Sequence, residues 1–182
     1  MSRTFRLFIT LSLASCGITG CADPERTARS EATPEDDGGM STVELSSEDV
    51  VAEAMGFEDN LTRLSEMAEQ SETHADAASV FVWGTPSVAD LYLSIDPDDP
   101  TQSVDFPQGT MFVKEHFDEA GDREGLTVMY KGPPGYNPDS RDWFWARVRG
   151  EETTHAGRVE WCSDCHNAAH NSDFVVGFGK SP

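Results

Sequence analysis

The sequence predicts an α+β fold, in which an antiparallel β-sheet of four or five strands is accompanied by a few short helices. First, four runs rich in β-branched and aromatic residues lie between residues 80 and 148, as is typical of strands. Second, segments 118–125 and 131–142 between these runs are short enough to join antiparallel neighbours. Third, helix-capping residues precede apolar residues at helical spacing before residue 95.

Three short helices are expected in this first part of the domain. The first begins after Ser46 or Ser47 and ends at Gly56, the second begins after Asn60, and the third begins after Thr85, which proline follows. The apolar residues that recur in them are Val50, Val51, Ala54, Leu61, Leu64, Met67, Ala68, Val88, Leu91, Tyr92 and Ile95.

The strand-like runs are 80–83, 110–117, 126–130 and 143–148. Side chains alternate between the two faces of a strand. In the second run one face therefore carries Phe112, Lys114 and His116, and the other carries Met111, Val113 and Glu115. In the fourth run Phe144 faces away from Trp143 and Trp145. Either set can line a ligand pocket, although plain core packing is the simpler interpretation of each residue.

The charge of the chain narrows the class of partner. The formal net charge is −20, and residues 1–20 contain two arginines and no acid, so the remainder is more acidic still. Such a surface repels nucleic acid and anionic lipid, and it favours small neutral or cationic ligands or basic proteins. Acidity that serves solubility alone explains the composition equally well.

Residues 1–20 have the features of a lipoprotein signal peptide. A short basic start precedes the mostly apolar segment 7–15, which is too short to span a bilayer. Ile18-Thr19-Gly20-Cys21 resembles a bacterial lipobox, which predicts lipidation at Cys21 and anchoring on the periplasmic side of a membrane. Cys16 also fits the pattern but leaves a very short apolar stretch. The alternative is ordinary secretion with an incidental cysteine.

Residues 21–46 are rich in Asp, Glu, Ser, Thr, Pro and Gly. They cannot bury enough apolar surface to fold, so we expect an acidic disordered tether that leads to a folded domain over 47–182. The four cysteines are Cys16, Cys21, Cys162 and Cys165, which leaves the middle of the chain without material for a disulfide framework.

Cys162-Ser163-Asp164-Cys165-His166 is the pattern of c-type haem attachment. Two thiols about one helical turn apart can add to the two vinyl groups of haem, and the next residue, His166, can then bind the iron. A zinc site needs more ligands than the chain offers here, and a thioredoxin-like motif needs a βαβ setting. A simple disulfide leaves His166 unexplained. We therefore expect one covalent haem c.

The sixth ligand of such an iron is left open by the sequence. No methionine follows His166, whereas small electron-transfer cytochromes usually carry a late methionine ligand. The remaining histidines are His74, His116, His155 and His170. His170 follows His166 by four residues, so one short helix would direct both to the same haem face.

Several segments together resemble the cytochrome P-460 and cytochrome c′-beta family. They are Phe106-Pro107-Gln108-Gly109-Thr110-Met111-Phe112-Val113-Lys114-Glu115, Met129-Tyr130-Lys131 with the following Gly-Pro-Pro-Gly-Tyr, Asp142-Trp143-Phe144-Trp145, and the late haem motif. The resemblance covers roughly residues 48–178. It implies a sheet-rich, usually dimeric haem domain with His166 proximal and an open or weakly held distal position.

The resemblance also implies two alternative activities. Some relatives oxidise hydroxylamine, and others bind nitric oxide. In the oxidising relatives a lysine is bonded to the haem, and Lys114 matches it, which makes Lys114 the candidate catalytic and haem-contacting residue. Those relatives also carry a carboxylate shortly before the first haem cysteine. Gly157 occupies the matching position, and Glu151, Glu152 and Glu160 are out of step. Without a placed proton acceptor, ligand binding is favoured over oxidation.

The expected function is therefore that of an exported monohaem c-type cytochrome. Its open distal site would bind nitric oxide or oxidise small nitrogen compounds such as hydroxylamine, with a redox partner protein. The alternative is a plain periplasmic electron-transfer cytochrome. Whether the protein is an enzyme is left open.

Overall fold

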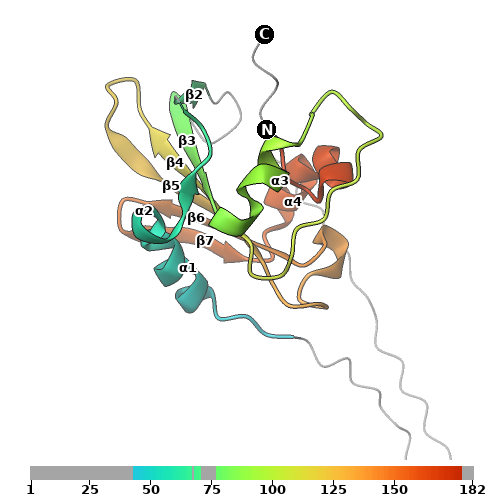
Figure 1. Ribbon diagram of the computed structural model, residues 1–182. Coiled ribbons are helices and arrows are strands. Elements are labelled where there is room, and N and C mark those ends of the chain that lie inside the picture. The colour runs from blue at the N-terminus through green and yellow to red at the C-terminus, as the bar shows by residue number, and fades with distance from the viewer. Residues whose placement is uncertain (1–42, 67, 71–76, 178–182) are drawn as a thin grey trace, which may run out of the picture. The chain divides into compact units, whose positions relative to one another are not determined.

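The structure is a computed structural model that describes residues 43–66, 68–70 and 77–177. Its strands form one antiparallel sheet, seen in Figure 1. Within the described residues the spatial order is β1 (Thr62–Arg63), β3 (Ser79–Gly84), β4 (Met111–Phe117), β5 (Arg123–Lys131), β6 (Trp143–Arg149) and β7 (Glu152–Gly157), and β2 (Glu69–Gln70) also pairs with β3.

The predicted α+β class is confirmed, and the four predicted runs correspond to β3, β4, β5 and β6. The sheet has more strands than the four or five expected, because β1, β2 and β7 were missed. Two of these are only two residues long, and β7 is a polar, mostly exposed strand paired with β6 alone. Such strands lack the apolar alternation by which a strand is recognised.

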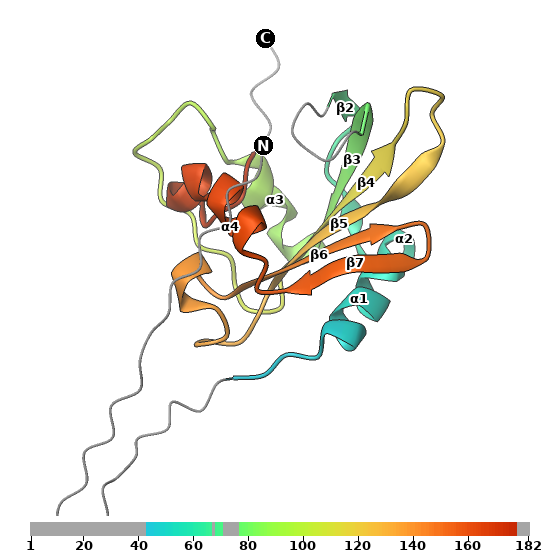
Figure 2. The same ribbon diagram turned by 180° about the vertical axis from the view of Figure 1, so that it is seen from behind.

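One face of the sheet packs against α1 (Ser47–Met55) and α2 (Phe57–Asn60). Figures 1 and 2 show these helices on one side of the strands and α3 and α4 on the other. Met111, Val113 and Phe144 face α1 and α2, as the predicted alternation requires. The buried Glu115 shares their side, where it accepts a hydrogen bond from Trp83 Nε1 and pairs with Arg123.

The opposite face lies beneath η1 (Pro86–Val88), α3 (Ala89–Leu93), α4 (Glu160–His166) and η3 (Asn167–Ser172), while η2 (Pro138–Ser140) lies in the β5–β6 connection. Phe112, Trp143 and Trp145 belong to the core on this side, together with Phe174 and Val175 from the segment after η3. Thus the two cores lie on opposite faces of the sheet, and the haem motif belongs to only one of them.

The predicted first helix is confirmed: Ser46 caps α1 by accepting a hydrogen bond from Asp49 N at 3.2 Å, and Gly56 ends the helix. The second helix was wrong, because Asn60 is the last residue of α2 and extended backbone follows it at Leu61. The third starts after Thr85 as predicted, but as one 3₁₀ turn before α3.

The predicted signal peptide 1–20, Cys21 and most of the tether 21–46 lie outside the described residues. In the part of the chain that the structure does describe, no helix has the length and apolar character needed to cross a membrane.

Candidate functional site

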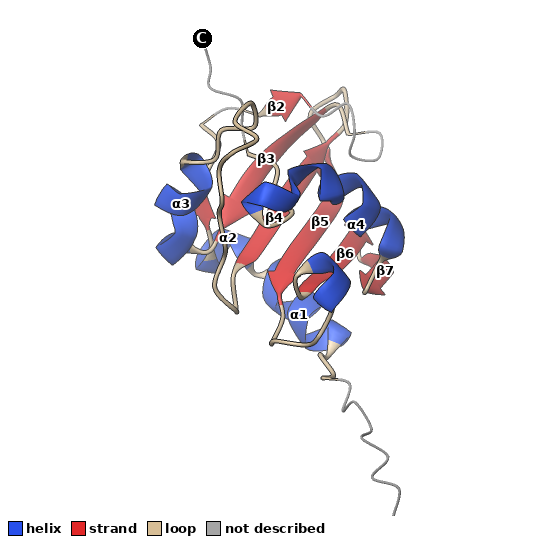
Figure 3. Ribbon diagram, turned by 90° about the vertical axis from the view of Figure 1, so that its right-hand side faces the viewer, coloured by secondary structure: helices blue, strands red, loops and turns tan. Residues whose placement is uncertain are grey.

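A cavity of about 410 Å³ lies between α4 and the sheet. Figure 3 shows α4 crossing in front of the strands. Cys162, Cys165 and His166 all line this cavity, and so does Lys114 from β4. The four residues predicted to contact a cofactor are therefore brought together, although Lys114 and Cys162 are far apart in the sequence.

The sheet supplies its side of the cavity through two rows of directly paired residues. One row runs from Val82 through Lys114 and Thr127 to Arg147, and the other runs from Phe112 through Met129 to Trp145. Directly opposite residues point to the same face of a sheet. The register therefore explains why these positions, alternate on each strand, line one cavity.

The other wall is α4, which presents the haem motif. Cys162 is half-buried and Cys165 is exposed, and both carry free thiols. Burial, with a smaller contribution from neighbouring Cys165, raises the pKa of Cys162 to about 12, so this group is a thiol rather than a thiolate at neutral pH. Because both cysteines and His166 line one cavity, a single bound group can contact all three.

His166 is buried and held in a defined orientation. Its Nδ1 lies 2.7 Å from the backbone carbonyl oxygen of Phe174, so Nδ1–H donates and Nε2 carries the ring's lone pair. The pKa of His166 is lowered to about 4, chiefly by burial; the bond to Phe174 opposes this shift, and the charge of Lys114 contributes to it. The neutral ring with a backbone-bonded Nδ1–H is the form in which histidine binds metals.

Lys114 lies in the middle of its strand and reaches into the cavity. Burial lowers the pKa of its ammonium group from 10.5 to about 8. A substantial fraction of Lys114 is therefore a neutral, nucleophilic amine at mildly alkaline pH.

Trp145 lines the cavity and carries a buried polar group of its own. Its side chain is 2 % exposed, and its Nε1 is the sole buried side-chain nitrogen or oxygen of the described residues that lacks a hydrogen-bond partner. Leaving such a donor unsatisfied is costly. The cavity volume is in the range of cofactor pockets, and thiols with a neutral imidazole suit haem c. The residues present therefore fit this group.

The histidines considered as sixth ligands of the iron do not line the cavity in the described part of the chain. His116 is buried but lies outside the cavity, and its Nε2 is 3.0 Å from the hydroxyl of Thr127. His155 and His170 are exposed, and His74 lies outside the described residues. Sequence reasoning missed Met129, which lines the cavity from β5, because a methionine ligand is expected after the haem motif and Met129 precedes it.

Residues 62–176 match the family model of cytochrome P460. The chain belongs to the cytochrome P460 family. The matched segment contains every cavity residue from Val82 to Val176. Membership in the cytochrome P460 family indicates a c-type haem cytochrome and therefore a haem cofactor. No curated protein gives a significant match.

Gly157 is the residue that the sequence resemblance matched to the carboxylate of oxidising relatives. It is the last residue of β7 and pairs with Trp145 of β6. Its φ of +117° is a conformation that residues with a side chain rarely adopt. None of the described residues that line the cavity is acidic. The backbone itself therefore disfavours a carboxylate at this position.

Proposed function

We propose that the protein is an exported monohaem c-type cytochrome whose second iron face binds nitric oxide or a similar small ligand. The observation that carries the proposal is the single cavity lined by Cys162, Cys165, His166 and Lys114. Attachment requires each thiol to add across one vinyl group. A carbon–sulfur bond forms, the thiol hydrogen passes to the other vinyl carbon, and no oxidant is consumed.

The roles of the residues follow from their positions. Cys162 and Cys165 would hold the haem covalently, and His166 would bind its iron through Nε2 while Phe174 fixes the ring. The bound haem would supply an iron able to take up a diatomic ligand or to exchange one electron. Trp145 and the sheet would shield it from water.

The polar residues of the cavity support ligand binding over hydroxylamine oxidation. Lys114, Thr127 and Arg147 line it, and all three side chains can donate hydrogen bonds. Oxidation of hydroxylamine needs a group that accepts protons, and none of the described residues that line the cavity is a carboxylate. Neutral Lys114 is the remaining candidate base, so the oxidising reaction would be slow and favoured by alkaline pH.

Met129 supports a second candidate function. Its thioether lies in the same cavity, and a methionine ligand to haem iron is typical of electron-transfer cytochromes. A six-coordinate iron held by His166 and Met129 would carry electrons and bind gases slowly.

The first experiment tests covalent attachment. Wild-type protein is denatured and extracted with acidified organic solvent, and haem is expected to stay with the protein. Cys162→Ala with Cys165→Ala should give protein without haem, whereas Ser163→Ala, between the two cysteines, should keep it. Haem that leaves wild-type protein with the solvent contradicts the proposal.

The second experiment separates ligand binding from electron transfer. Ferrous protein is mixed with carbon monoxide or nitric oxide, and a rapid spectral change is expected. A low-spin spectrum that neither gas alters in the wild type, but that Met129→Leu makes responsive, favours the electron carrier. Intact masses of wild type and Lys114→Ala, both with haem, reveal whether Lys114 is bonded to the macrocycle.

Export and anchoring are part of the proposal and rest on the sequence. Cys21 would carry the lipid, and residues 22–46 would tether the domain on the periplasmic side of the membrane. Cys21→Ser should move the protein from the membrane to the soluble fraction, and Cys16→Ser should leave it in place. A mature N-terminus at another residue would contradict this assignment.

A further inference from the structure

The carbonyl group that orients His166 belongs to an unusual piece of backbone. Asp173 and Phe174 have φ of +57° and +64°, and neither is glycine. Two consecutive residues in the left-handed region persist only where surrounding contacts hold them. The Phe174 carbonyl that accepts from His166 is therefore presented by backbone that depends on its neighbours.

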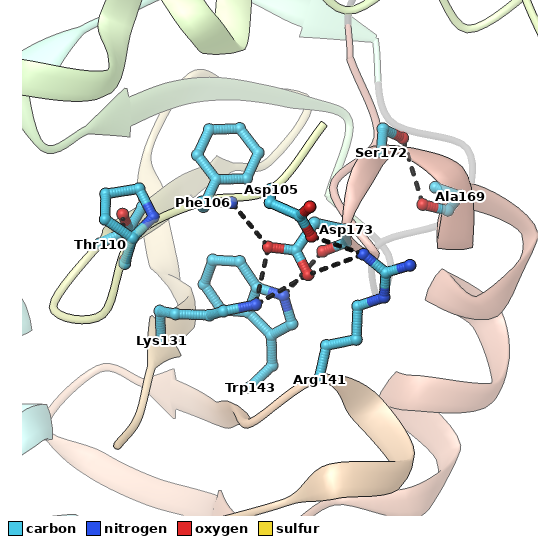
Figure 4. Close-up of polar contacts among 10 residues, drawn as sticks. Asp105, Phe106, Thr110, Lys131, Arg141, Trp143, Ala169, Ser172 and Asp173 are labelled. Carbon is cyan, nitrogen blue, oxygen red and sulfur yellow. Dashed lines mark hydrogen bonds and ion pairs between the residues drawn. The ribbon is translucent and has the colours of Figure 1, made fainter. Parts of the chain in front are cut away.

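Those contacts converge on Asp173, which is fully buried. Figure 4 shows its carboxylate facing the ammonium group of Lys131. Lys131 Nζ lies 2.7 Å from both carboxylate oxygens, and the backbone N–H of Phe106 donates to one of them at 2.9 Å. Arg141 adds a longer contact of 4.0 Å.

The backbone of Asp173 is held as well. Trp143 Nε1 donates to its carbonyl oxygen at 2.7 Å. Lys131 Nζ also lies over the ring of Trp143, at 4.9 Å from its centroid. Lys131 of β5 thus holds the carboxylate of Asp173, and Trp143 of β6 holds its backbone carbonyl.

This arrangement connects the sheet to His166 through a short path. Two backbone hydrogen bonds hold Lys131 at the end of β5. Its N–H donates to Thr110 O and its carbonyl oxygen accepts from Gly109 N, both at 2.8 Å. Asp173 is the direct neighbour of Phe174, whose carbonyl oxygen accepts a hydrogen bond from His166 Nδ1. A change at Asp173 therefore reaches His166 through a single peptide unit.

We propose that Asp173, held by Lys131, is the positioning residue for His166 and thereby sets the electron-donating strength of the histidine toward bound haem iron. This inference rests on the proposed function. A well-placed acceptor at Nδ1–H raises the basicity of a metal-bound imidazole. Loss of that placement weakens the iron–histidine bond and favours ferrous over ferric iron.

The test compares the haem-loaded wild type with Asp173→Asn, which keeps the shape of the side chain and removes its charge. The iron–histidine stretching band of the ferrous protein, measured by resonance Raman, should move to lower frequency. The midpoint potential should move to a more positive value. A residue that only stabilises the fold would lower the melting temperature and leave both readings unchanged.

Asp105→Asn is the matched control, because it makes the same chemical change at a neighbouring carboxylate that is exposed and pairs with Arg141. It should leave band and potential unchanged. If Asp173→Asn fails to fold, the double variant Asp173→Asn with Lys131→Met removes both charges and should show the same two shifts. Folded variants with a wild-type band and potential overturn the inference.

The two proposals fail in distinguishable ways. Wild-type protein without covalent haem overturns the proposed function, and this inference with it. Wild-type protein with haem, alongside Asp173 variants that do not differ from it in band or potential, overturns the positioning role alone.

Discussion

The imidazole of His166 packs against the indole of Trp145, with ring centroids 4.7 Å apart and planes inclined by 59°. His166 is the last residue of α4, which carries the haem motif, and Trp145 lies in β6. The contact therefore joins α4 to the sheet on the face that the cavity occupies.

Trp145 should be important for stability. Because its side chain is buried, Trp145→Ala is expected to lower the free energy of unfolding by about 3–5 kcal/mol. The matched control is Trp161→Ala, since Trp161 is 48 % exposed and should cost about 1 kcal/mol or less. Denaturant unfolding of both variants measures the difference, and equal losses would contradict the assignment of Trp145 to the core.

The stability of the folded protein should depend on pH through Lys114. Its pKa is about 8 in the folded protein and 10.5 ordinarily, so its buried charge destabilises the fold fully below pH 8. This penalty, up to about 3 kcal/mol, falls as the pH rises from 8 to 10.5 and is absent above that. Lys114→Met should therefore exceed the wild type in stability at pH 7 and lose its advantage by pH 10.5.

Denaturant unfolding at pH 7, 9 and 10.5 measures this dependence. Lys114→Arg is the control, because arginine keeps its charge throughout and should gain no stability over this window. A constant difference between wild type and Lys114→Met would show that the amine does not titrate as expected, which a bond to haem would also cause.

Gly157 should resist replacement by any residue that has a side chain. Because its φ is +117°, Gly157→Ala and Gly157→Glu should each destabilise the protein by about 1–3 kcal/mol. His155→Glu places the same charge on β7 at a residue without positive φ and should cost much less. Thermal melting distinguishes the variants, and a Gly157→Glu protein as stable as wild type would refute the strain argument.

Ser46 and Ser47 were equivalent candidates for the first cap, and the structure selects Ser46. Ser46→Ala removes the bond to Asp49 N and should cost about 1 kcal/mol of unfolding free energy. Ser47→Ala, within the first turn, should change it by a few tenths at most. A larger loss for Ser47→Ala than for Ser46→Ala would mean that α1 starts one residue later.

The central sheet was predictable because its strands are long and apolar. Their register was not predictable, and it is the register that places Lys114, Thr127 and Arg147 in one row across three strands. Alternation along one strand gives the face of a residue, but only pairing between strands gives its neighbours. The missed strands are short or polar, so they lack the alternating apolar residues that indicate a half-buried strand in a sequence.

The site was partly predictable for a similar reason. Cys162, Cys165 and His166 form a local motif, whereas Met129 and Trp145 reach the cavity only through tertiary folding. Asp173 gave no signal, because one aspartate in a chain with 33 acidic residues is expected at the surface. Its role depends on Lys131, which is distant in the sequence. The helix predicted after Asn60 failed because that residue ends α2 rather than starting a helix.

The walls of the cavity come from residues spread between Val82 and Val176. Contacts between such distant parts of a chain slow folding, because long loops must close before any of them forms. Because α4 and the sheet both supply its walls, the cavity is complete only when both are in place. The colour of an attached haem would consequently report completed tertiary packing rather than the formation of single strands or helices.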